Sequence, residues 1–142
     1  MTSPARSLRT STGPGARGAG PVGVVVVDDS PVFRTGMTRA VQACEGLSLL
    51  GEAADGEAAL RLVDELEPDV LILDLRMPGI DGFGVLDRLH ADGASPCRTL
   101  VISATLEHGV EAELLAAGAD ACLSKALSRA EICATALRLA DR

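Results

Sequence analysis

The stretch VVVVDDSPVF, residues 24–33, decides the fold. Four consecutive valines are typical of a strand that is buried on both faces, as in a parallel sheet covered by helices. The valines end in two adjacent aspartates, Asp28 and Asp29. Two such charges about 4 Å apart repel by roughly 4 kcal/mol at an effective dielectric constant near 20. The end of this strand therefore needs a compensating cation and is a candidate binding site.

The sequence that follows alternates short apolar runs with segments of helical periodicity, which indicates parallel strands joined by crossover helices. Ser30 followed by Pro31 begins the first helix, and Ser128 with Glu131 is a capping box that begins the last. We predict an α/β fold, a (βα)5 doubly wound five-stranded parallel sheet of the flavodoxin-like type with strand order 2-1-3-4-5. The expected strands are 23–28, 47–53, 69–74, 98–103 and 120–123. The expected helices are one from Pro31, one that stops before Pro68, a short one around 85–89, one at about 106–117 and one from Ser128.

Composition indicates one globular domain. The chain has 142 residues, of which 47% are hydrophobic and 23% charged, enough for a substantial core. Residues 1–21 are rich in Ser, Thr, Gly, Pro and Ala and are expected to be a flexible tail, which leaves 22–142 as the domain. The only charged side chains of residues 1–21 are Arg6, Arg9 and Arg17. The net charge of the whole chain is −7, and that of the part from Val22 onward is therefore −10. We expect no nucleic-acid binding by this chain itself, because its domain is acidic.

The four cysteines, Cys44, Cys97, Cys122 and Cys133, show no CxxC spacing. They are expected to be reduced thiols rather than zinc ligands. No apolar run reaches the length of about 20 residues that spans a bilayer, and residues 1–21 lack the apolar core of a signal peptide. The expected location is cytoplasmic, with no membrane partner.

Polar side chains follow the expected strands. Asp28 and Asp29 follow the first strand, Asp74 ends the third, and Ser103 ends the fourth; Lys125 follows the fifth. Each alone has an ordinary explanation, such as a helix cap for an aspartate, a turn for Ser103 and a solvated surface position for Lys125. Together they meet at the carboxyl edge of the sheet, where ligands bind in such folds. Three carboxylates there favour Mg²⁺.

These residues lie in four motifs, VVVVDDSPVFRTGM, LILDLRMPGIDGF, LVISA and GADACLSKA. With them the chain resembles the receiver domains of two-component response regulators over residues 22–141, most closely the receivers that precede a LuxR-type helix-turn-helix. The sequence leaves open whether the chain is a stand-alone receiver or part of a longer protein. The resemblance implies that the chain takes part in phosphorelay signal transduction and controls an output, which is expected to be transcription.

The resemblance also implies site roles. Asp74 would accept a phosphoryl group from a phosphohistidine of a sensor histidine kinase, and Mg²⁺ would be bound by Asp28, Asp29, Asp74 and the backbone carbonyl of Arg76. Lys125 and Ser103 would contact the phosphoryl oxygens, and small Ala104 would leave the group accessible. The fourth helix, fifth strand and last helix would form the face for a second copy or another partner. Beyond self-phosphorylation and self-dephosphorylation, the chain is not expected to be an enzyme.

One position departs from the resembled pattern. Receivers usually have Tyr or Phe three residues before the lysine, and here that residue is Cys122. Either loop movement alone carries the signal, or the output is altered or independent of phosphorylation. The second case corresponds to an atypical receiver that acts as a protein-interaction module. A phosphatase of the haloacid-dehalogenase type is disfavoured, because it needs an aspartate where this chain has Arg76.

Overall fold

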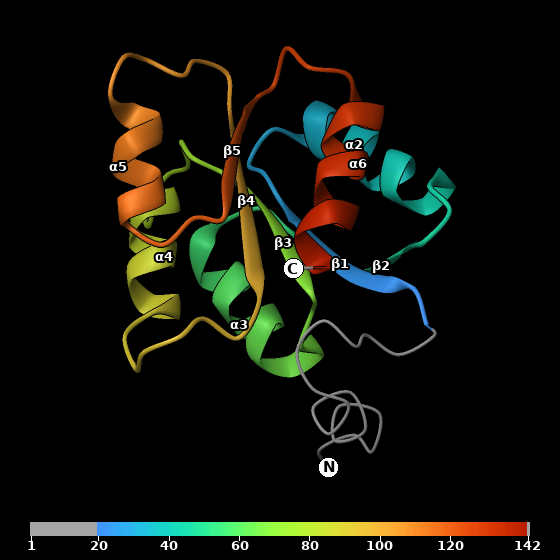
Figure 1. Cartoon of the computed structure of the whole chain (residues 1–142), viewed down its shortest axis with the longest axis horizontal. Helices are drawn as coiled ribbons and strands as arrows, with labels where there is room; N and C mark the ends of the chain where they lie inside the picture. The colour runs from blue at the N-terminus through green and yellow to red at the C-terminus, as the bar shows by residue number, and fades with distance from the viewer. Residues whose placement is uncertain (1–19, 142) are drawn as a thin grey trace.

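The computed structural model describes residues 20–141, and the predicted flexible tail therefore lies outside the described residues except for Gly20 and Pro21. The strands are β1 (Val22–Val27), β2 (Leu47–Ala53), β3 (Val70–Asp74), β4 (Arg98–Ser103) and β5 (Ala121–Ser124). The helices are α2 (Pro31–Ala43), α3 (Gly56–Leu66), α4 (Gly82–Leu89), α5 (Val110–Ala116) and α6 (Arg129–Ala140). Strands and helices alternate throughout, as the periodicity predicted (Figure 1).

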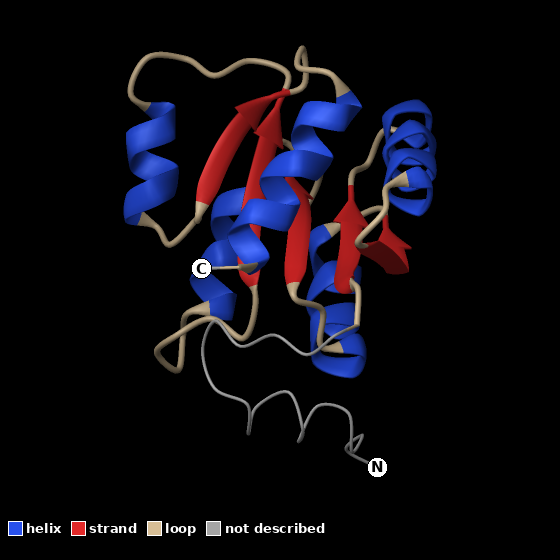
Figure 2. Ribbon diagram, turned by 45° about the vertical axis from the view of Figure 1, so that its right-hand side comes forward, coloured by secondary structure: helices blue, strands red, loops and turns tan. Residues whose placement is uncertain are grey.

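The strands form one parallel sheet in the order β2-β1-β3-β4-β5, which confirms the prediction. Because β1 and β3 are neighbours although β2 comes between them in sequence, the strand order reverses at this pair. All five strands point the same way, so their carboxyl ends meet at one edge of the sheet (Figure 2). That edge is where an open α/β sheet binds ligands.

The four valines of β1 serve two cores. Val25 and Val27 pack in one cluster with residues of α3 and α4, whereas Val24 and Val26 pack in a second cluster with residues of α2 and α6. All four are fully buried. Alternate side chains of a strand point to opposite faces, so an unbroken apolar run is what a strand covered on both sides requires.

Most predicted boundaries agree with the structure within one residue. Ser30, Asp55, Asp81 and Ser128 each accept a backbone N–H bond at the start of their helix, and Ser128 with Glu131 completes the predicted capping box. The prediction of a helix at 106–117 was wrong at its start, because α5 begins at Val110. Gly109, with φ 89°, precedes α5 and offers no side-chain cap, so residues 106–109 belong to the loop after β4.

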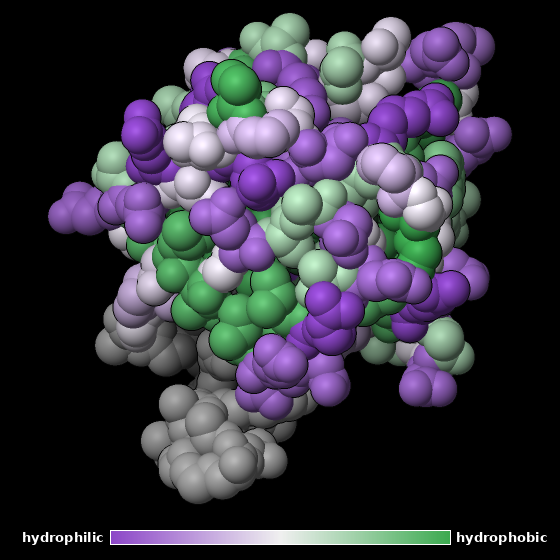
Figure 3. All heavy atoms as spheres, turned by 180° about the vertical axis from the view of Figure 1, so that it is seen from behind, coloured by the Kyte–Doolittle hydropathy of each residue, from purple (hydrophilic) through white to green (hydrophobic). Residues whose placement is uncertain are grey.

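The surface of the described region is mainly polar, with one gathered hydrophobic area on the face shown in Figure 3. The large hydrophobic side chains that remain exposed are Val32, Leu50, Leu66, Leu115 and Leu127. No helix within residues 20–141 is long and apolar enough to cross a membrane.

Replacing Ile72 by alanine is expected to lower the free energy of unfolding by about 2–5 kcal/mol, because Ile72 is fully buried in β3 and its removal leaves a cavity. Leu115→Ala is the matched control, since Leu115 is 45% exposed on α5 and its loss should cost about 0.5 kcal/mol or less. Urea denaturation of both variants measures the difference. Equal losses would show that the central strand is not the packed core described here.

Candidate functional site

Asp28 is held at the end of β1 by backbone and side-chain bonds. Its backbone N–H donates to the carbonyl of Ala53 at 3.1 Å, and its Oδ1 accepts from the N–H of Ser30 at 2.8 Å. Arg34, one turn into α2, donates from Nη1 to the carbonyl of Asp28 at 2.7 Å and from Nε to Glu52 at 3.0 Å. Asp28 has no exposed surface, and these bonds fix the position of its carboxylate.

Asp74 ends β3, the neighbour of β1, and is 3% exposed. One oxygen from each of Asp28, Asp29 and Asp74 lies within 4.8 Å of the others, and of the three residues only Asp29 is exposed. The structure thus brings together the three carboxylates that the sequence placed at two strand ends.

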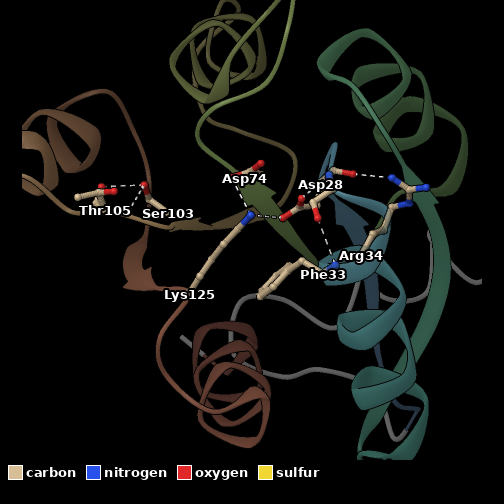
Figure 4. A network of polar contacts seen from close by, with 8 residues as sticks. Asp28, Phe33, Arg34, Asp74, Ser103, Thr105 and Lys125 are labelled. Carbon is tan, nitrogen blue, oxygen red and sulfur yellow. Dashed lines mark hydrogen bonds and ion pairs between the residues drawn. The ribbon is translucent and has the colours of Figure 1, made fainter.

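Lys125 follows β5 and reaches back to this cluster (Figure 4). Its Nζ lies 2.8 Å from Asp28 Oδ2 and 3.4 Å from Asp74 Oδ1. Its backbone N–H donates to the carbonyl of Ser103 at 2.9 Å, which fixes the base of the side chain beside β4. The lysine side chain is 18% exposed, so both ion pairs are largely shielded from water.

The residues fit a hard divalent cation. Asp28 Oδ2 is buried and forms an ion pair with the Lys125 ammonium, but it accepts no hydrogen bond. A buried carboxylate oxygen that accepts no hydrogen bond, within reach of two further carboxylates, is a suitable ligand for Mg²⁺.

The clustering of carboxylates affects the pKa of Asp74. The pKa of Asp74 is raised from 3.8 to about 6, chiefly by burial and then by the charge of Asp28, while Lys125 opposes both effects. A hydrogen bond with Asp29 also favours the protonated form. The ionised form of Asp74 therefore depends on positive charge nearby.

Ser103 is buried at the end of β4, but its hydroxyl does not point toward the carboxylates (Figure 4). It donates to the carbonyl of Thr105 at 2.8 Å and accepts from the N–H of Thr105 at 3.3 Å. Ala104, between them, is exposed. The predicted phosphoryl ligand Ser103 thus ends a strand at the same edge of the sheet, with its hydroxyl bonded inside the following loop.

Cys122 lies in β5 opposite Val101 and is 8% exposed. Burial raises the pKa of its thiol to about 11, so at neutral pH it is a protonated core residue. It belongs to the core cluster that also contains Val101 of β4 and Leu114 of α5.

Sequence reasoning missed two residues at this site. Arg34 binds the Asp28 carbonyl, and the ring centroid of Phe33 lies 4.5 Å from Lys125 Nζ. Helical periodicity places Phe33 among the apolar residues of its helix, but it does not show which loop packs against the first turn. The charge of Arg34, one turn after the acidic pair, was the available signal.

Without divalent metal, stability is expected to fall as the pH rises from about 4 to about 6. The folded pKa of Asp74 is above its ordinary value of 3.8, so between these pH values the folded protein binds more protons than the unfolded chain. Its stabilisation is present below pH about 4 and is lost as the pH passes 6, by up to about 3 kcal/mol. Urea denaturation in EDTA measures this loss, and Asp74→Asn should remove it. A wild-type loss that Asp74→Asn does not reduce would contradict the assignment.

The comparisons with known proteins agree with this geometry. The profile of the response regulator receiver domain matches residues 24–137. The probable transcriptional regulatory protein NarL of Mycobacterium tuberculosis is 43% identical over 111 residues, which are 78% of this chain and 51% of that protein. Protein-glutamate methylesterase/protein-glutamine glutaminase 5 of Myxococcus xanthus is 45% identical over 74% of this chain and 30% of its own length. This chain therefore spans about half or less of the length of these relatives.

Solved structures show the same fold. The signal receiver domain of the putative response regulator NarL from M. tuberculosis superposes with a TM-score of 0.81 and 41% identity, covering 85% of this chain and 97% of that one. The response regulator domain of Thermotoga maritima CheB gives a TM-score of 0.72 and 26% identity, covering 83% and 97%. From its sequence profile, its relatives and its strand order, the chain belongs to the receiver domains of two-component response regulators, resembling those of the LuxR-type class.

Proposed function

We propose that this receiver is a phosphoacceptor switch whose nucleophile is Asp74. The observation that carries the proposal is the pairing of one ammonium, Lys125 Nζ, with the carboxylates of both Asp28 and Asp74 at the carboxyl edge of the sheet. Phosphoryl transfer requires little beyond positioning and neutralisation of charge, and this edge supplies both.

The proposed donor is a phosphohistidine of a sensor histidine kinase. A carboxylate oxygen of Asp74 attacks the phosphorus, the bond from phosphorus to the histidine nitrogen breaks, and an acyl phosphate forms on Asp74. The released imidazole takes up a proton. Since a protonated carboxyl group is a poor nucleophile, the positive charge of Lys125 promotes the reaction by opposing the effects that raise the pKa of Asp74.

Mg²⁺ would be held by Asp28, Asp29, Asp74 and the backbone carbonyl of Arg76, and would supply neutralisation of the phosphoryl oxygens. The residues of the chain account for the rest of the chemistry. Asp28 is fixed by Ser30 and Arg34, so its carboxylate does not rearrange as charge builds up at Asp74. Lys125 is already within 3.4 Å of Asp74 and pairs with a phosphoryl oxygen there after a small movement.

The proposed switch is the loop that follows β4. A phosphoryl group adds a charge of about −1.5 to −2 and three acceptor oxygens. The Ser103 hydroxyl now donates to Thr105, and it would exchange this bond for one to the phosphoryl group. Such an exchange releases Thr105, and exposed Ala104 adds no bulk at the site. Movement of residues 104–109 would then change the face formed by α5, β5 and α6, the proposed surface for a second copy or another partner, with transcription as the proposed output.

Cys122 favours one alternative, an atypical receiver that binds partners independently of phosphorylation. The thiol is buried and too small to act as the aromatic switch of the resembled receivers. The proposal requires that the loop respond without such a ring. Chemical shifts of Ser103, Thr105 and Cys122 that stay unchanged on phosphorylation would favour the alternative.

Exposure to acetyl phosphate and Mg²⁺ is expected to add one phosphoryl group to the wild-type chain and none to Asp74→Asn, as measured by intact mass. The physical reason is that the variant lacks the carboxylate oxygen beside Lys125 at the end of β3 that would attack the phosphorus. Asp87→Asn, an equal change at an exposed position of α4, is the matched control and should still gain the group. Gain by Asp74→Asn, or none by the wild type, would contradict the proposed function.

A further inference from the structure

Lys125 is the single lysine of this chain, and an aromatic ring lies against its ammonium. The distance from Nζ to the centroid of the Phe33 ring is 4.5 Å (Figure 4). A cation within about 6 Å of a ring face is attracted by the ring quadrupole, and more strongly where water is excluded. The lysine side chain is 18% exposed, so this contact is partly desolvated.

The ring is itself held in place from two sides. Phe33 lies in the first turn of α2 and packs against the core cluster between the sheet, α2 and α6. The guanidinium carbon of Arg129, at the start of α6, lies 5.1 Å from the ring centroid. Gly36 makes room for this guanidinium, because a Cβ there would lie 2.7 Å from both Nε and Nη2 of Arg129. The ring is therefore a fixed part of the α2 and α6 interface.

The Phe33 ring gives the Lys125 ammonium a contact that does not involve the carboxylates. Its stem of four methylene groups is flexible, and its two carboxylate partners, Asp28 and Asp74, lie where a cation or a phosphoryl group would compete with the ammonium for them. The attraction of a ring does not depend on their ionisation. The chain has only two aromatic residues, Phe33 and Phe83, and Cys122 on the strand that leads to Lys125 offers no ring.

We propose that Phe33 is a positioning residue for Lys125, whose ammonium it holds at the sheet edge so that a phosphoryl group on Asp74 meets an oriented cation. The proposal rests on the proposed function of Asp74, but the contact between Phe33 and Lys125 exists without phosphorylation and can be measured separately.

The contact is tested by NMR of the full chain in EDTA, with isotope-labelled lysine giving a single side-chain signal. We expect NOEs between the Phe33 ring protons and the ε-methylene protons of Lys125, and an upfield ring-current shift of that ε signal. Phe33→Leu should abolish the upfield shift and Phe33→Tyr should retain it. Phe83→Leu removes the other ring, on the opposite face of the sheet, and should leave the signal unchanged. Absence of the NOEs in the wild type would overturn the proposal even if a Phe33 variant failed to fold.

The consequence for chemistry is tested by the rate of phosphorylation from acetyl phosphate with Mg²⁺. Loss of one cation–π contact should slow Phe33→Leu by about two- to fivefold, with Phe33→Tyr restoring the rate and Phe83→Leu unaffected. A wild-type rate in Phe33→Leu would overturn the positioning role alone. Failure of the wild-type chain to gain a phosphoryl group, with the NOEs intact, would instead overturn the proposed function and with it the purpose of the contact.

Discussion

The structure of the site depends on one constraint, the burial of the Asp28 carboxylate. Asp28 has no exposed surface, and the Lys125 ammonium at 2.8 Å opposes the unfavourable burial of its charge. Removal of one partner from a buried ion pair typically costs about 3–5 kcal/mol, because the remaining charge is left unpaired in a poorly polarisable environment. The first strand and the loop after the fifth are thus tied together across the edge of the sheet.

The same constraint explains how a stable fold can carry the proposed phosphoacceptor site. Asp28, Asp29 and Asp74 repel one another, and a single ammonium does not neutralise three carboxylates, so the raised pKa of Asp74 reflects burial and repulsion that remain only partly relieved. A cation or a phosphoryl group that arrived at this edge would change the balance between the repulsion among the carboxylates and their attraction to Lys125. Under the proposals made above, the Ser103 hydroxyl, bonded to Thr105, and the Phe33 ring, beside Lys125, would be the neighbouring groups that respond.

Much of this could be predicted from the sequence, because it follows from local patterns. The apolar runs specified the strands, and parallel strands bring Asp28, Asp74, Ser103 and Lys125 to one edge whatever the details of packing. The start of α5 could not be predicted in this way, since the residues before Gly109 have helical propensity but no cap. The direction of the Ser103 hydroxyl depends on a nearby backbone acceptor. The contact of Phe33 with Lys125 depends on how α2 packs against the loop after β5. Neither feature produces a periodic pattern in the sequence.

The most direct test of this account is the free energy of unfolding as a function of Mg²⁺ concentration at constant ionic strength and neutral pH. Because the three carboxylates fit a divalent cation only when folded together, Mg²⁺ should stabilise the wild-type chain by about 1.4 kcal/mol for each tenfold increase above its dissociation constant. Asp29→Asn changes the exposed carboxylate of the cluster without disturbing the buried pair, and its stabilisation should begin at higher Mg²⁺ concentration. Equal stabilisation of both proteins, or none of the wild type, would contradict the claim that a cation relieves the repulsion at the end of β1.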